Sequence, residues 1–253
     1  MSWAQQRKAT YTLSFVTIIV IILIIIFFTF FNKKATCSDS VQNQGETGID
    51  CGGPCSMLCR ADYTSPTVLW VRWAKILKSG TYNLLAYAEN PNIGVGASNV
   101  PYTFKIYDKD NILLYTKTGS ASIPANNNFV VFESGIDVHD KVPARVDFQF
   151  SNQYAWQKVA NLEQYITVAS KTVSNESTSP KVFATLKNSS LNQINNIQSV
   201  AILYDQDGNA IAFSKTLTDG IASGSTADIV FTWPEIFSNQ VQKIDIVSQV
   251  LAQ

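Results

Sequence analysis

The segment FKIYDKDN, residues 104–111, returns in altered form as AILYDQDGN at residues 201–209, and this repetition decides the fold. The preceding stretch repeats as well, because LLAYAENPN at 84–92 corresponds to VFATLKNSS at 182–190. Four aligned landmarks are separated by 98, 97, 98 and 99 residues: Asn90 with Asn188, Tyr107 with Tyr204, Ile123 with Ile221, and Phe132 with Phe231. Spacings that agree this closely predict two copies of one domain.

The sequence around these landmarks has the pattern of an all-β protein. Short alternating or apolar runs are separated by Asn-Pro, Asp-Gly and Ser-Gly turn signals, and no long segment after the N-terminal region shows a 3.6-residue period. Each copy has about 90 to 100 residues, the size of an immunoglobulin-like sandwich. We therefore expect tandem immunoglobulin-like β-sandwiches at residues 66–152 and 166–253, joined by a linker at 153–165.

Each copy of the repeated segment carries a pair of carboxylates, Asp108 with Asp110 and Asp205 with Asp207. We expect these residues to shape a hairpin turn rather than to perform acid–base chemistry. The second copy continues with glycine, which supplies the positive φ that such a turn needs. The first copy has Asn111 at that position, and asparagine tolerates positive φ at some cost.

Both copies resemble the β-sandwich family named for an F-x-L-Y-D signature, which is broadly similar to the sandwiches of late-embryogenesis-abundant-like proteins. The first copy has isoleucine in place of the leucine, and the second copy departs at the phenylalanine position. The resemblance implies a β-sandwich in an extracytoplasmic setting and no catalytic activity. Its residues are Phe104-Lys105-Ile106-Tyr107-Asp108 and Ala201-Ile202-Leu203-Tyr204-Asp205, with Asn90 and Asn188 ending the preceding strand.

A segment of 21 uncharged residues runs from Tyr11 to Phe31. As a helix it spans roughly 31 Å, the thickness of the hydrocarbon core of a bilayer. The apolar run is longer than that of a signal peptide, and no A-x-A-like cleavage site follows it. We therefore expect a retained transmembrane helix at 11–31 after a cytoplasmic tail at 1–10, with Lys33 and Lys34 at the membrane interface.

The four cysteines, Cys37, Cys51, Cys55 and Cys59, all lie in the glycine-rich segment 37–59 that follows this helix. The segment cannot bury a core, so we expect two disulfides in an oxidising space, with three pairings open. Structural zinc is the main rival, although thiolate zinc sites more often show a two-residue gap within each pair. Basic residues flank the helix equally and leave its orientation open. The cysteines therefore place the C-terminal part outside the cytoplasm.

The cysteine segment also resembles a short motif of secreted and surface proteins, approximately C-x-D-G-x-x-N-x-x-E-T-G-x-D-C-G-G-x-C, with Ser40 in place of the usual glycine. The motif contains four side chains that carry oxygen atoms. Oxygen is the ligand that calcium prefers, so a structural calcium ion is one interpretation. The alternative is that these side chains cap turns of their own backbone. The four candidate ligands are Asp39, Asn43, Glu46 and Asp50.

Several classes of function have little support in the sequence. The net charge is zero and no basic stripe occurs, which argues against nucleic-acid binding. There is no P-loop, no H-E-x-x-H motif and no nucleophile elbow, and the one histidine, His139, is expected at the surface. We therefore predict that the chain is not an enzyme and has no small-molecule substrate. Two glycosylation sequons begin at Asn175 and Asn188.

These features together predict a membrane-anchored, extracytoplasmic structural or interaction protein of the cell envelope. The anchor holds the chain in the membrane, the cysteine segment serves as a stalk, and the sandwiches present a surface to a protein partner. One alternative is an accessory subunit of a membrane-embedded secretion or pilus-like assembly, in which the transmembrane helix makes the working contact. An envelope hydrolase is a further alternative, which the residue inventory argues against.

Overall fold

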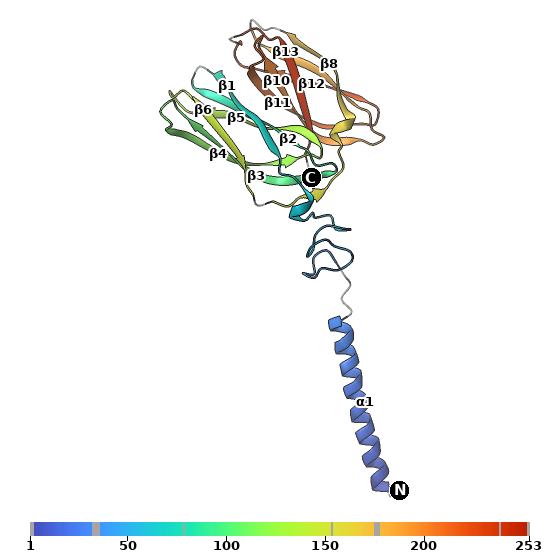
Figure 1. Cartoon of the computed structure of the whole chain (residues 1–253). Coiled ribbons are helices and arrows are strands. Elements are labelled where there is room, and N and C mark those ends of the chain that lie inside the picture. The colour runs from blue at the N-terminus through green and yellow to red at the C-terminus, as the bar shows by residue number, and fades with distance from the viewer. Residues whose placement is uncertain are drawn as a thin grey trace. The chain divides into compact units, whose positions relative to one another are not determined.

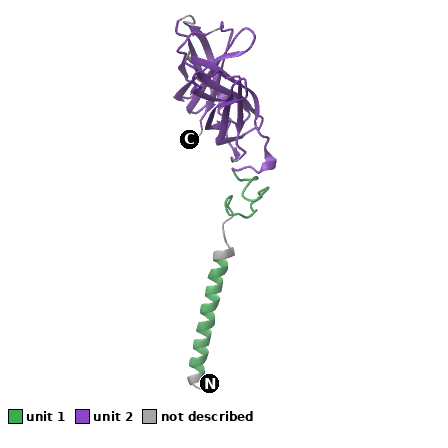
Figure 2. Cartoon of the chain, turned by 90° about the vertical axis from the view of Figure 1, so that its left-hand side faces the viewer, with its two compact units in different colours: residues 1–55 green, residues 56–253 purple. Residues whose placement is uncertain are grey.

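The computed structural model describes residues 3–31, 36–77, 79–152, 154–174, 178–237 and 239–251. The flanking Lys33 and Lys34, and the sequon that begins at Asn175, lie outside the described residues. The chain divides into two compact units, residues 1–55 and 56–253 (Figure 2). We describe each unit by itself.

The first unit contains one long helix, α1 (Trp3–Phe31), followed by the cysteine segment. The part from Gln5 to Phe28 contains an 18-residue stretch with a mean hydropathy of 2.9 and is long and apolar enough to cross a membrane. Its described side chains are exposed on every face, and a helix that is apolar all round is typical of a membrane span. This helix is therefore a membrane anchor or a signal sequence by length and composition.

The second unit begins with the short 3₁₀ turn η1 (Arg60–Asp62) and the first β-sandwich (Figure 1). A three-stranded antiparallel sheet of order β1-β2-β5 faces a four-stranded antiparallel sheet whose main order is β4-β3-β6. A short strand, β7, pairs with the start of β3. The strands are β1 (Thr67–Leu77), β2 (Thr81–Asn90), β3 (Val95–Tyr107), β4 (Leu113–Ile123), β5 (Asn127–Asp137), β6 (Arg145–Phe150) and β7 (Gln157–Lys158).

The second sandwich repeats this topology strand for strand. After the 3₁₀ turn η2 (Glu163–Tyr165), its sheets have the orders β8-β9-β12 and β11-β10-β13. These match β1-β2-β5 and β4-β3-β6 of the first sandwich. The fold class is therefore mostly β, with two sandwiches. The strands are β8 (Ile166–Ser174), β9 (Lys181–Asn188), β10 (Ile194–Tyr204), β11 (Ala210–Ile221), β12 (Thr226–Thr232) and β13 (Lys243–Val250).

The segment expected as a linker is largely folded onto the first sandwich. Trp156 is buried in the first core and stacks on Tyr63, with ring centroids 4.8 Å apart. Residues 156–158 also form backbone hydrogen bonds with the last residues of the cysteine segment: Leu58 donates to the Trp156 carbonyl, and Lys158 donates to the Ser56 carbonyl. This connection between the sandwiches is therefore part of the first core.

Each sandwich has its own core, and the register of the strands corrects one sequence landmark. Phe231 points into the second core and pairs with Val182, whereas Leu84, the equivalent of Val182, pairs with Glu133. The structural equivalent of Phe231 is thus Glu133, and the alignment of Phe231 with Phe132 is wrong by one residue. A slip of one residue moves a side chain to the other face of the sheet.

Phe132 lies on that other face, in a third apolar cluster between the two sandwiches. The outer face of β1-β2-β5 packs against the outer face of β11-β10-β13, so the four sheets form consecutive layers. Figure 1 shows the sandwiches lying against each other. The buried members of the cluster are Ala74, Leu85, Val130, Phe132, Val200, Ile202 and Phe213.

Substitutions between the copies explain why these two faces meet. On the second copy, Ile202 pairs with Phe213, where the first copy pairs Lys105 with Thr116. These positions are therefore apolar in the second copy, where the outer face of the sheet packs against the first sandwich. They are polar in the first copy, where the outer face of the sheet is in solvent. Apolar side chains that leave water stabilise the contact by about 25 cal/mol per Å² of buried area.

The free face of the second sandwich shows the reverse pattern. Ser170 donates a hydrogen bond to Thr185, and Thr185 donates to Asp228, over 3.1 and 2.7 Å. The strand register places these residues where the first copy has Trp70, Tyr87 and Val130 on its packed face. A polar row of this kind ends the stack after two sandwiches, as polar outer faces do in repeat proteins.

Candidate functional site

The cysteine segment is crosslinked as expected. Cys37 and Cys55 form a disulfide with Cα atoms 5.7 Å apart. Cys51 and Cys59 are disulfide-bonded as well, and none of the four cysteines is a free thiol. Because a disulfide sulfur is not a thiolate, the proximity of Cys37, Cys55 and Glu46 does not make a zinc site in this state. Disulfides that close short loops therefore hold this segment together in place of an apolar core.

The three carboxylates of this segment accept hydrogen bonds from its backbone, whereas Asn43 Oδ1 is buried without a hydrogen-bond partner among the described residues. The Asp50 carboxylate accepts the N–H groups of Asp39 and Ser40, at 2.9 to 3.1 Å. Glu46 is buried and accepts the N–H groups of Asn43 and Asp50. These contacts favour turn capping over metal binding, since the carboxylates already have backbone partners.

Asp39 has a similar role in the same turn. Its carboxylate accepts Nδ2 of Asn43 at 3.0 Å and backbone N–H groups of Thr36 and Val41. The hydrogen bond from Asn43 is the main cause of the lowered pKa of Asp39. Within the described part of the chain, Asp39, Glu46 and Asp50 do not form one group with ligand atoms within 4.8 Å. The calcium site stays a prediction.

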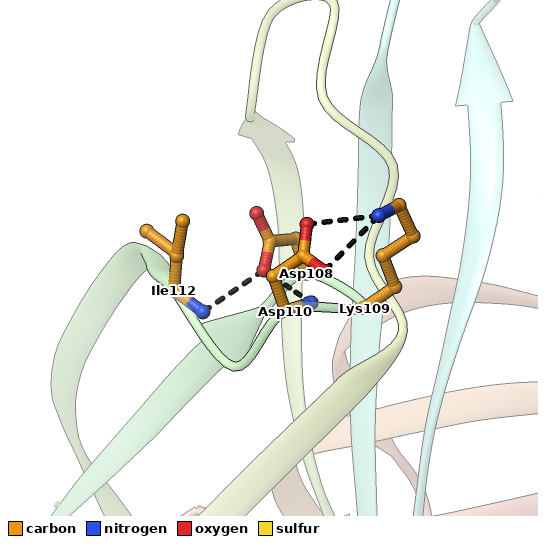
Figure 3. Close-up of polar contacts among 4 residues, drawn as sticks. All are labelled: Asp108, Lys109, Asp110 and Ile112. Carbon is orange, nitrogen blue, oxygen red and sulfur yellow. Dashed lines mark hydrogen bonds and ion pairs between the residues drawn. The ribbon is translucent and has the colours of Figure 1, made fainter.

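The carboxylate pairs of the repeated segment lie in hairpin turns, as Figure 3 shows for the first copy. Asp108 Oδ1 accepts the N–H groups of Asp110 and Ile112, both at 2.9 Å. Asp205 Oδ1 accepts the N–H groups of Asp207 and Asn209 in the same way, at 3.0 and 2.9 Å. An aspartate that accepts two backbone N–H groups is shaping its turn.

The expected positive φ is present in both hairpins. Asn111 has φ of 59° and Gly208 has φ of 77° at the matching positions. The Asp205 carboxylate has a lowered pKa, chiefly because the backbone of Asn209 donates to it. His139, a residue with φ of 55°, is exposed and lies 3.5 Å from Asp137. These polar groups stabilise turns at the surface.

The residues Asn90 and Asn188 hold the loops between the second and third strands of each copy. Asn90 Nδ2 donates to the carbonyls of Val95 and Pro124, at 2.7 and 2.6 Å. Asn188 Nδ2 donates to the carbonyls of Asn192 and Ile221, at 2.8 and 2.9 Å. Asn188 is fully buried, so its amide is not accessible as a glycosylation acceptor in the folded chain.

The loops that these asparagines hold present two matched apolar side chains. Ile93 lies three residues after Asn90, and Leu191 lies three residues after Asn188. Their exposed fractions are 82% and 92%, the highest among the large hydrophobic residues of the described chain. The sequence pattern marked the asparagines but not these neighbours, because exposure of a loop residue has no periodic signal.

Two cavities lie along the junction of the sandwiches. The polar one, of about 310 Å³, contains Tyr102 and Glu133 from the first sandwich and Gln249 from the second. The Tyr102 hydroxyl donates to Glu133 at 2.7 Å, and Lys117 lies 3.7 Å from the same carboxylate. Burial is the first cause of the raised pKa of Tyr102. Glu133 therefore has two partners.

The second cavity, of about 400 Å³, has mainly apolar walls and one carboxyl group, that of Glu163. Burial raises the pKa of Glu163, while the N–H of Val250 donates to Oε1 at 3.0 Å and acts in the opposite direction. The sequence offered no signal for this site, because its walls come from segments that are far apart in the chain.

Comparisons with known proteins give no family. The sequence matches no protein-family model and no curated protein. Weak structural matches include Bacteroides uniformis β-glucuronidase (TM-score 0.25, 12% identity, 68% of this chain and 24% of that chain covered) and red sea bream transglutaminase (TM-score 0.23, 9% identity, 75% and 32% covered). A β-glucuronidase from glycoside hydrolase family 2 matches with a TM-score of 0.20 and 10% identity, over 87% of this chain and 29% of that chain. The chain thus spans about a third of these proteins or less, and the likeness carries no functional argument.

Proposed function

We propose that the chain is a membrane-anchored, extracytoplasmic interaction protein whose two sandwiches hold a protein partner at the cell envelope. The observation that carries this proposal is the matched pair of exposed aliphatic residues, Ile93 and Leu191. A large apolar side chain at a loop tip is costly in solvent and gains free energy when a partner covers it. Two such residues at equivalent positions give the partner two similar contacts.

The loops that carry these residues are fixed in shape. In the first copy, Asn92 Nδ2 donates to the Thr64 carbonyl, and the N–H of Thr64 donates to Asn92 Oδ1, both at 2.7 Å. In the second copy, Ser189 donates from its N–H and its hydroxyl to the carbonyl of Tyr165. A loop that is ordered before binding loses less conformational entropy when it binds, which favours its use as a contact surface.

The remaining features agree with this function. The apolar helix supplies an anchor, the disulfides suit an oxidising compartment, and the apolar cluster between the sandwiches belongs to the one compact unit that contains both loops. The carboxylates of the hairpins serve the fold, which removes the most obvious acid–base candidates. We accordingly infer that the chain works by binding and not by catalysis.

Photo-crosslinking in intact cells tests this proposal. A photoreactive amino acid replaces Ile93 or Leu191 in the full chain, and a third variant carries it at Leu217. Leu217 is an exposed leucine on β11 and is the matched control. We expect the first two positions to capture the same partner and Leu217 to capture none. Equal capture at all three positions, or none at the loops, would refute the role of the loops.

Substitution separates the loops from the anchor. Ile93→Ser and Leu191→Ser together should abolish co-purification of the captured partner and leave the unfolding midpoint unchanged, because neither side chain is buried. Replacement of α1 by an unrelated hydrophobic helix should preserve the interaction. Loss of function with the replaced helix would favour an accessory subunit of a membrane assembly instead.

A further inference from the structure

The apolar cavity at the junction of the sandwiches is built from three parts of the second unit. The first sandwich supplies Ala97, Ile123 and Pro124, the connecting segment supplies Val159 and Leu162, and β13 supplies Val250. Its volume of about 400 Å³ falls in the range of ligand-binding pockets, which is roughly 300 to 1,000 Å³. The cavity is therefore large enough for a flexible side chain or a small molecule.

Glu163 is the one ionisable residue in the wall of this cavity. Its side chain is held away from water, and the residue is only 8% exposed. In the described ranges of the chain, no lysine, arginine or histidine forms an ion pair with it, and no neighbouring charge contributes to the shift of its pKa. A buried carboxylate without a cation is unfavourable, and a buried ionisable group in the wall of a cavity is a candidate for ligand binding.

The repeat shows that the fold does not need a carboxyl group here. Thr67 and Thr167 have equivalent places at the starts of β1 and β8, since each pairs with the residue before the buried asparagine. Four residues before Thr67 the first copy has Tyr63, whereas four residues before Thr167 the second copy has Glu163. The tyrosine packs on the first core, while the glutamate faces a cavity.

We propose that this cavity binds a primary ammonium group on a short aliphatic stem, with Glu163 as its ionic partner. The apolar walls suit a stem of four methylene groups, as in lysine, and the carboxylate supplies the missing counter-charge. Hydrogen bonds that involve two charged groups are about twice as strong as neutral ones, particularly in a site shielded from water. The hydroxyls of Ser98 and Ser122 offer further acceptors in the wall.

Two sources of this group are compatible with the site: a free alkylamine and a lysine side chain of the partner. The second source rests on the proposed function, because the cavity adjoins the Ile93 loop. Val159 in the cavity wall donates its N–H to the carbonyl of Gly94, next to Ile93, at 2.9 Å. A partner that covers Ile93 could therefore place a lysine in the cavity.

Titration of the purified full chain in nonionic detergent tests the proposal. The probes are n-butylammonium chloride and Nα-acetyl-lysine methylamide, and the uncharged control is Nα-acetyl-norleucine methylamide. The amide resonance of Val250 reports on the site, because its N–H bonds to Glu163. We expect this resonance to shift with the charged probes and to shift little with the norleucine compound. Shifts with both charged probes admit a free amine as ligand, and a shift with the lysine compound alone assigns the site to a peptide.

Two variants make the test specific. Glu163→Gln keeps an acceptor for Val250 and should weaken binding at least about tenfold, the effect of one lost charge-assisted hydrogen bond. Glu133→Gln changes the neighbouring polar cavity and should leave binding unchanged. Three results would each overturn the proposal. They are an unchanged affinity of the Glu163→Gln chain for the charged probes, an affinity for the norleucine compound equal to that for the lysine compound, and no shift of the Val250 resonance with any probe. None of these outcomes alters crosslinking at Ile93, so the interaction function is judged separately.

Discussion

Asn83 of β2 donates a hydrogen bond from Nδ2 to the carbonyl oxygen of Phe213 in β11, at 3.0 Å, and thereby joins the two sandwiches. The same carbonyl accepts Nε1 of Trp233 at 3.1 Å. Because β11 is an edge strand of its sheet, these side chains satisfy a backbone group that no neighbouring strand can reach. The other end of Asn83 accepts the N–H of Gly135 at 3.2 Å.

Asn83→Ala should lower the free energy of unfolding by about 1 to 3 kcal/mol, since the Phe213 carbonyl loses one of its two donors and the N–H of Gly135 loses its acceptor. Urea unfolding of the full chain in detergent, followed by tryptophan fluorescence, measures this change. Asn128→Ala, at an exposed site of β5, is the control and should have a smaller effect. Equal effects of the two variants would show that Asn83 does not fasten the junction.

The two sandwiches should separate when residues on the outer face of β11-β10-β13 are replaced by those at the matching positions of the first copy. Ile202→Lys with Phe213→Thr installs the equivalents of Lys105 and Thr116, and each change removes buried apolar volume or buries a charge. We expect a loss of about 3 to 5 kcal/mol or more, and two unfolding transitions in place of one. Phe183→Thr on the free face is the control and should change the midpoint little. A single unshifted transition would contradict the packing of these faces.

Asn188→Ala should destabilise the second sandwich by about 2 to 4 kcal/mol, because several buried partners lose their donor at once. Asn90→Ala should have a similar effect on the first sandwich. Hydrogen exchange of the amides in β9 and β2 distinguishes which sandwich has loosened.

In cells that attach N-linked glycans, Ser190→Ala should not change the electrophoretic mobility of the chain, because Asn188 is buried. A mobility change would show that Asn188 is reached before folding.

The pH dependence of stability should include a contribution from Asp205. Its pKa is lower in the folded chain than in the unfolded chain, so the ionised carboxylate stabilises the fold above the unfolded pKa of about 4. That stabilisation is lost as the pH falls through the lowered, folded-state pKa. Asp205→Asn should flatten this acid dependence in urea unfolding at pH 3 to 7. The same acid dependence in the Asp205→Asn chain and in the unchanged chain would exclude a contribution from Asp205.

Removal of the Cys37–Cys55 disulfide should loosen the cysteine segment and leave the sandwiches intact. A disulfide that closes a loop of this size restricts the unfolded chain by roughly 3 kcal/mol. With Cys37→Ser and Cys55→Ser, we expect limited proteolysis to cut within residues 36–55 while the unfolding midpoint of residues 56–253 stays the same. A lowered midpoint would show that the two compact units depend on each other.

The repeat, the apolar helix and the crosslinked segment could all be predicted from sequence, because each depends on local pattern. The 98-residue spacing of Asn90 and Asn188 specifies one topology made twice, and 21 uncharged residues suffice for a membrane-length helix. The positive φ at Asn111 follows from the glycine at the matching position of the second copy. These patterns can be recognised in the sequence because each one is produced by residues that are close together in the chain.

Only the tertiary structure decided which faces meet and what lies between them. Phe132 and Phe231 look alike in the alignment, yet one lies between the sandwiches and the other lies in a core, since a one-residue difference in register reverses the face. The cavity at Glu163 is lined by residues of the β3–β4 hairpin and of β13, which is distant from that hairpin in sequence. Local sequence patterns therefore specify the two sandwiches and the apolar helix, while packing over long range forms the junction and its cavity.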